Sequence, residues 1–121
     1  MSFGELVQKR RLKLRQSLRA FCMKNGVDPS NWSKMERGVI PPPQNQDKLK
    51  EYASYLGIEF GTDDWYDFSD SAAADKGIIP KDLMSDEELV SALPLFFRTV
   101  RNEKPTKEEL LEFAEHLRKH P

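Results

Sequence analysis

The side chains best suited to binding chemistry lie in residues 28–38, which read Asp-Pro-Ser-Asn-Trp-Ser-Lys-Met-Glu-Arg-Gly. Asp28 is a good helix N-cap, and Pro29 suits the first helical position, where no amide donor is needed. We expect Trp32 and Met35 to face inward. The opposite face would then carry hydrogen-bonding and cationic side chains suited to base edges and phosphates. These side chains are Ser30, Asn31, Ser33, Lys34 and Arg37.

A second short helix is predicted just before this segment. Ser17 is its expected N-cap, and Leu18, Phe21 and Cys22 form its apolar face. Gly26 can adopt a positive φ and end the helix. A free cysteine packs like a small hydrophobe, which suits a steep crossing of two helices. Two short helices joined by a glycine turn predict a helix-turn-helix, with residues 28–38 entering the major groove.

These stretches resemble the lambda-repressor-like, XRE-type helix-turn-helix family. The resemblance rests on Ser-Leu-Arg-Ala-Phe-Cys at residues 17–22, on the run from Gly26 to Gly38, and on the prolines at 41–43, and it covers about residues 3–58. It implies an ion pair between Arg11 and Glu36 of the first and third helices. It also implies a DNA-binding surface, for which we expect Arg15, Ser17, Arg19, Ser30, Asn31, Ser33, Lys34 and Arg37.

The chain departs from the family pattern at three places. Arg15 and Gln16 stand where the family usually has glycine and an apolar residue, so Arg15 adds a cation beside the expected phosphate contacts. Leu18 replaces a glutamine that often contacts DNA. Trp32 is large for an inward position, and we expect it to be partly exposed.

Helical periodicity continues to the end of the chain, which predicts an all-α fold. We expect a five-helix-type helix-turn-helix DNA-binding domain over residues 1–60 and a helical C-terminal extension over residues 61–121. Thr62 is a predicted cap, and Ser85 with Glu88 and Thr106 with Glu109 are predicted capping boxes. Pro94 is expected to break or kink its helix, so that residues 95–101 form a separate turn or two.

Composition narrows the function classes. Residues 1–58 carry a net charge of +6 and the remainder carries −7, which favours a polyanion partner for the first half alone. No pattern suggests a nucleophile with a base, paired carboxylates or a phosphate loop, so we expect no enzyme activity and no cofactor. His116 and His120 lack the further ligands that a metal site needs. Without an apolar run of about 20 residues to span a membrane, the chain is expected in the cytoplasm.

The sequence therefore predicts a sequence-specific DNA-binding transcriptional regulator that acts on double-stranded DNA, as a homodimer. The apolar segment Leu93-Pro94-Leu95-Phe96-Phe97 either packs onto the DNA-binding domain or forms a dimer or partner interface. The alternative is an antitoxin that binds a protein toxin through its C-terminal half and represses its own operon. An effector protein is a further possible partner.

Overall fold

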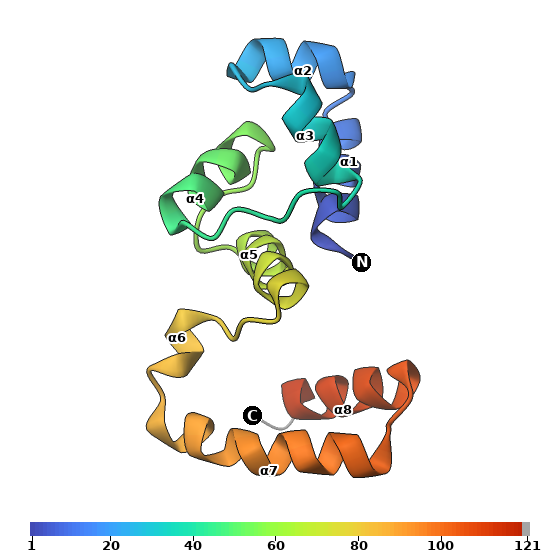
Figure 1. The fold of residues 1–121 in the computed structure, drawn as a ribbon, viewed down its shortest axis with the longest axis vertical. Coiled ribbons are helices and arrows are strands. Elements are labelled where there is room, and N and C mark those ends of the chain that lie inside the picture. Colours follow the sequence, from blue (N-terminus) through green and yellow to red (C-terminus); the bar gives the residue numbers. More distant parts are fainter. Residues whose placement is uncertain (120–121) are drawn as a thin grey trace. The chain divides into compact units, whose positions relative to one another are not determined.

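A computed structural model describes the backbone of residues 1–119 and the side chains of residues 1–116 (Figure 1). The described residues form eight α-helices and no strand, which confirms the all-α prediction. They divide into two compact units, Met1–Pro80 and Lys81–Pro121. The predicted boundary after residue 60 is therefore not where the structure divides.

The first unit contains the helices α1 (Phe3–Lys13), α2 (Leu18–Asn25), α3 (Pro29–Glu36), α4 (Gln46–Tyr55) and α5 (Asp63–Lys76). Each begins at a polar N-cap whose side chain accepts a first-turn amide, and the caps predicted at Ser17, Asp28 and Thr62 are confirmed. Gly26 ends α2 with φ +68°, as its position predicted. These local signals set where the helices begin and end.

The hydrophobic core of the described residues lies within this unit. α1 packs against both α3 and α5, α2 packs against α3, and α4 packs against α5. The α5 side chains Trp65, Phe68 and Ala72 are buried. The ring centroids of Phe68 and Phe3 are 5.1 Å apart. α5 therefore belongs to the same core as the helices before it, which is why the unit extends to Pro80. The other buried hydrophobic side chains are Val7, Phe21, Cys22, Trp32, Met35, Leu49, Ala53, Leu56 and Ile58.

The second unit contains α6 (Lys81–Met84), α7 (Glu87–Glu103) and α8 (Lys107–Lys119). A short connection follows α7, and α8 runs back in the opposite direction (Figure 1). The predicted capping box at the start of α8 is confirmed, because Thr106 Oγ1 accepts the Glu109 amide at 3.2 Å and Glu109 Oε1 accepts the Thr106 amide at 3.3 Å.

Two predictions for the second unit were wrong. Asp86, and not Ser85, caps α7, because its carboxylate accepts the amides of Glu88 and Leu89 while Ser85 Oγ donates to the Asp82 carbonyl. Pro94 lies inside a continuous α7 instead of breaking it. A proline costs a helix one hydrogen bond and a local distortion. Val90, the residue whose carbonyl loses that bond, is only half-buried, so water can satisfy it.

Across residues 1–119, every helix is too short or too polar to cross a lipid bilayer.

Candidate nucleic-acid interface

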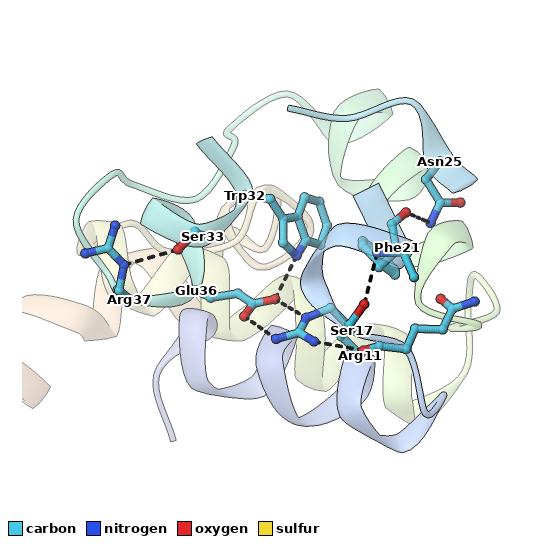
Figure 2. Close-up of polar contacts among 10 residues, drawn as sticks. Arg11, Ser17, Phe21, Asn25, Trp32, Ser33, Glu36 and Arg37 are labelled. Atoms are coloured by element: carbon cyan, nitrogen blue, oxygen red, sulfur yellow. Dashed lines mark hydrogen bonds and ion pairs between the residues drawn. The ribbon is translucent and has the colours of Figure 1, made fainter. Parts of the chain in front are cut away.

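The inner face of α3 is fixed by a buried polar network with α1 (Figure 2). Arg11 donates from Nε to Glu36 Oε2 at 2.7 Å and from Nη2 to Oε1 at 2.9 Å. Hydrogen bonding to this carboxylate raises the pKa of the guanidinium above its ordinary value. Arg11 Nη1 also donates to the Gln16 carbonyl at 2.9 Å, which joins the turn between α1 and α2 to the network. The ion pair implied by the family resemblance is confirmed.

Trp32 is part of this network, and the prediction that it would be partly exposed was wrong. Only 3% of its surface is accessible, and its indole Nε1 donates to Glu36 Oε2 at 2.8 Å. Its ring also packs against Phe21 and Tyr52, with centroids 4.9 and 5.0 Å away. The size of Trp32 is accommodated because its one polar group has a buried acceptor and its ring fills space between α2 and α4.

The turn between α1 and α2 has an unusual residue at its tightest point. Arg15 adopts a φ of +59°, in the left-handed region that glycine favours. The resemblance expects glycine at this position, and the chain places a strained arginine in a conformation that glycine favours. The Arg15 side chain is exposed beside the start of α2.

The start of α2 carries two more of the predicted residues. Ser17 Oγ accepts the Ala20 amide at 3.1 Å, and both Ser17 and Arg19 are exposed. At the other end of α2, the Asn25 side-chain amide donates to the Phe21 carbonyl at 3.0 Å, so the approach to the Gly26 turn is held by a side chain (Figure 2). The first-turn amides of a helix have no partner within that helix, which makes the N-terminal end of α2, beside Ser17, a favourable place for an anion.

The outer face of α3 carries the remaining predicted residues. Ser30, Asn31 and Arg37 are exposed, and Ser33 and Lys34 are half-buried. Arg37 Nε donates to Ser33 Oγ at 3.3 Å, which aligns the guanidinium along the last turn (Figure 2). All eight predicted site residues therefore lie on the turn before α2, the first turn of α2, or α3 and its C-cap, and all are accessible to solvent.

The structure adds one residue that the sequence reasoning did not single out. Val39 follows the C-terminus of α3 and is 61% exposed, and its amide donates to the Lys34 carbonyl at 2.8 Å. An exposed valine held against the end of α3 could contact a thymine methyl group. In the sequence, Val39 lies between Gly38 and the prolines at 41–43, and this position after the end of a helix was the signal that could have pointed to it.

Charge is divided within the first unit. Residues 15–37 contain five Lys or Arg and two acids, one of which is the buried Glu36. Residues 59–80, which include α5, contain six acids and one base. On α1, Lys9, Arg10 and Lys13 line a hollow with Asp64 and Asp67 of α5. The α1 cations beside α5 therefore have acidic neighbours. The cations of α2 and α3 do not line this acidic hollow.

No family model, curated protein or solved structure matches the chain. Within the part of the chain that the structure describes, no three His, Cys, Asp or Glu side chains are grouped as a metal site would require. His120 lies outside the described residues.

Proposed function

We propose that the chain is a sequence-specific DNA-binding regulator whose α2 and α3 form a helix-turn-helix. The observation that carries this proposal is the division of α3 into two faces. Trp32, Met35 and Glu36 anchor the inner face, while the outer face offers neutral hydrogen-bonding groups and cations to solvent. A helix held in this way can enter the major groove, which is about 12 Å wide in B-DNA.

Base reading would fall to the outer face of α3. The Asn31 side chain offers a donor and an acceptor together, which matches the N6 and N7 edge of adenine. Lys34 can donate to the O6 and N7 acceptors of guanine, and Ser30 and Ser33 can bond to either edge. All four side chains are accessible without moving the Arg11–Glu36 network.

Phosphate binding would fall to the residues around this face. Arg15, Ser17 and Arg19 surround the N-terminus of α2, where the helix dipole and unpaired amides favour an anion. Arg37 at the C-cap of α3 would contact the other side of the groove. Each cation that neutralises a phosphate releases counterions, so binding should weaken as salt concentration rises.

The charge distribution supports the antitoxin alternative less well than it supports DNA binding. Residues 59–80, with a net charge of −5, hold most of the acidic excess, and they lie in the first unit. Residues 81–121 hold nine acids and seven bases, a net charge of only −2. The second unit by itself therefore has little long-range attraction for a basic toxin.

The test is a gel-shift series over salt concentration with duplex DNA from upstream of the chain's own gene. Lys34→Glu together with Arg37→Glu should abolish specific binding and leave the circular dichroism spectrum unchanged. Lys9→Glu together with Lys13→Glu is the matched control, because it makes the same change in net charge beside α5. The control should keep specific binding. Equal affinities for the two double variants would overturn the proposal, since only overall charge would then matter.

A further inference from the structure

A hollow of about 300 Å³ lies in the first unit, where the start of α1, the segment after α3 and the second half of α5 meet. Sites for small molecules begin at about this volume. The hollow shares no lining residue with the one between Lys9 and Asp67. Its walls carry the apolar side chains of Phe3, Met35, Val39, Ile40, Pro41 and Pro42. These side chains would cover the apolar part of a bound molecule.

Asp75 of α5 supplies the only charged side chain among the described residues that line the hollow. Its Oδ2 accepts the Phe3 amide at 3.0 Å, which holds the carboxylate at the start of α1. Its Oδ1 has lone pairs for further donors. Between residues 1 and 116, Asp75 forms no ion pair. The hollow therefore has a negative charge that is not paired with a cation of the described chain.

Two helix ends beside the hollow do not reverse this charge. The N-terminus of α1 carries a partial positive charge, and Asp75 accepts one of its amides. The C-terminus of α3 carries a partial negative charge of similar size. The carbonyl oxygens of Met35 and Glu36, in the last turn of α3, approach Gly4 on the wall of the hollow. The two partial charges offset each other, so the carboxylate sets the sign of the electrostatic potential.

One carboxylate within an apolar lining selects the class of ligand. A neutral apolar molecule would cover the carboxylate without replacing its bound water, which costs free energy. An anion would be repelled. A molecule with an ammonium group and an apolar body suits both parts of the hollow. The ammonium group donates a charge-assisted hydrogen bond to Asp75, and the body covers the apolar walls.

We infer that this hollow binds a small organic amine, with its ammonium group on Asp75 and its apolar body against Val39 and Pro41. The inference does not rest on the proposed function, because binding of the amine is measured without DNA. If both hold, the amine covers part of Val39, and amine and DNA weaken each other's binding by the same factor. The two can fail separately. Asp75→Asn should lose amine binding and keep DNA binding, and Lys34→Glu together with Arg37→Glu should do the reverse.

The first test compares ligands of similar shape and different charge on the full wild-type chain. Benzylamine is cationic, benzyl alcohol is neutral and benzoate is anionic, and each titration is followed by the backbone amide NMR shifts. Benzylamine should shift the Phe3 and Val39 amides saturably and bind at least about threefold more tightly than benzyl alcohol. Benzoate should bind most weakly. The inference is overturned if benzylamine does not saturate, if either other ligand binds as tightly, or if the shifts are confined to other parts of the chain.

The second test removes the charge of Asp75. Asp75→Asn keeps an oxygen that can accept the Phe3 amide. It should raise the benzylamine Kd at least about threefold, to the level of benzyl alcohol. Circular dichroism checks that the variant folds, and if it does not, the ligand series on the wild-type chain decides.

Asp67→Asn is the matched control for this variant. It makes the same change in charge on an exposed side chain of α5 that does not line this hollow. At about 0.15 M salt, it should change the benzylamine Kd by less than about 1.5-fold, because solvent and salt screen the more distant charge. Equal effects of the two variants would overturn the inference, since only net charge would then matter.

Discussion

Arg11 of α1 and Glu36 of α3 form a bidentate ion pair, and the accessible surface of these residues is only 6% and 8%. Trp32 donates to the same carboxylate from within α3. The pair therefore joins a helix that lies in the core to the helix whose outer face is proposed to read DNA. It helps to hold α3 against α1.

Removing one partner of this pair should be costly. Glu36→Ala leaves the Arg11 charge buried without its counter-ion, with only the Gln16 carbonyl as an acceptor, and leaves the Trp32 indole N–H without one. It should lower the free energy of unfolding by about 3–5 kcal/mol. Urea denaturation gives the value. The control is Arg11→Met with Glu36→Leu, which leaves no buried charge and should cost clearly less than Glu36→Ala. A loss below about 1 kcal/mol for Glu36→Ala would show that the pair is not buried as described.

Gly4 is expected to tolerate no side chain, although it lies in the first turn of a helix. A Cβ at this position would lie 2.5 Å from the Glu36 carbonyl oxygen and 2.6 Å from that of Met35. Because these are backbone atoms, α1 and α3 would have to separate. Gly4→Ala should therefore lower stability by about 1–3 kcal/mol, even though alanine is the better helix former by about 1 kcal/mol. Gln8→Ala, an exposed change in the same helix, should be neutral or stabilising in the same thermal melt.

Arg15→Gly should move stability and DNA binding in opposite directions. Glycine relieves the left-handed strain at φ +59°, and after the larger entropy of the unfolded chain is subtracted, the gain should be about 0.5–1 kcal/mol. The same change removes one proposed phosphate contact, so the slope of log affinity against log salt should fall by about 0.9. Thermal melts and the salt series measure the two effects. A less stable variant would contradict the strain, and an unchanged slope would contradict the contact.

Cys22 should make stability depend on pH on the alkaline side. Burial raises the pKa of its thiol above the usual value of 9.0, so the folded state keeps the proton that the unfolded state loses. The contribution of Cys22 is complete below the unfolded pKa and is lost as pH rises through the folded pKa. Cys22→Ala removes this titration. The stability advantage of the wild type over Cys22→Ala should thus shrink between about pH 7 and about pH 10 in denaturant melts. An advantage that is constant or grows would contradict this sign.

Two truncations should separate the boundary predicted from the sequence from the one seen in the structure. A chain of residues 1–80 keeps every buried hydrophobic side chain of the described residues and should unfold cooperatively as a monomer. A chain of residues 1–60 lacks Trp65, Phe68 and Ala72, and the two aromatic side chains alone contribute about 1.5–3 kcal/mol each when buried. It should be largely unfolded by circular dichroism. Equal melting temperatures for the two chains would contradict the role of α5.

The sequence predicted the local features of the site well, because the signals are local. Ser17, Asp28, Gly26 and Thr62 each act on amides or carbonyls within a few residues, so their roles follow from residue type and spacing. Ser85 failed as a cap because Asp86, one residue later, offers a carboxylate to the same helix end. Pro94 failed as a helix break because a single lost hydrogen bond did not outweigh the turns on both sides.

Residue types and their order were sufficient for the all-α class, the ends of α2 and α3, and the outward residues of α3. Only the tertiary structure showed that Trp32 is buried, that Gly4 contacts the backbone of α3, and that α5 completes the core of the first unit. Each of these depends on contacts between residues far apart in the chain. Helical periodicity tells which side of a helix is apolar, but not which helix will cover it.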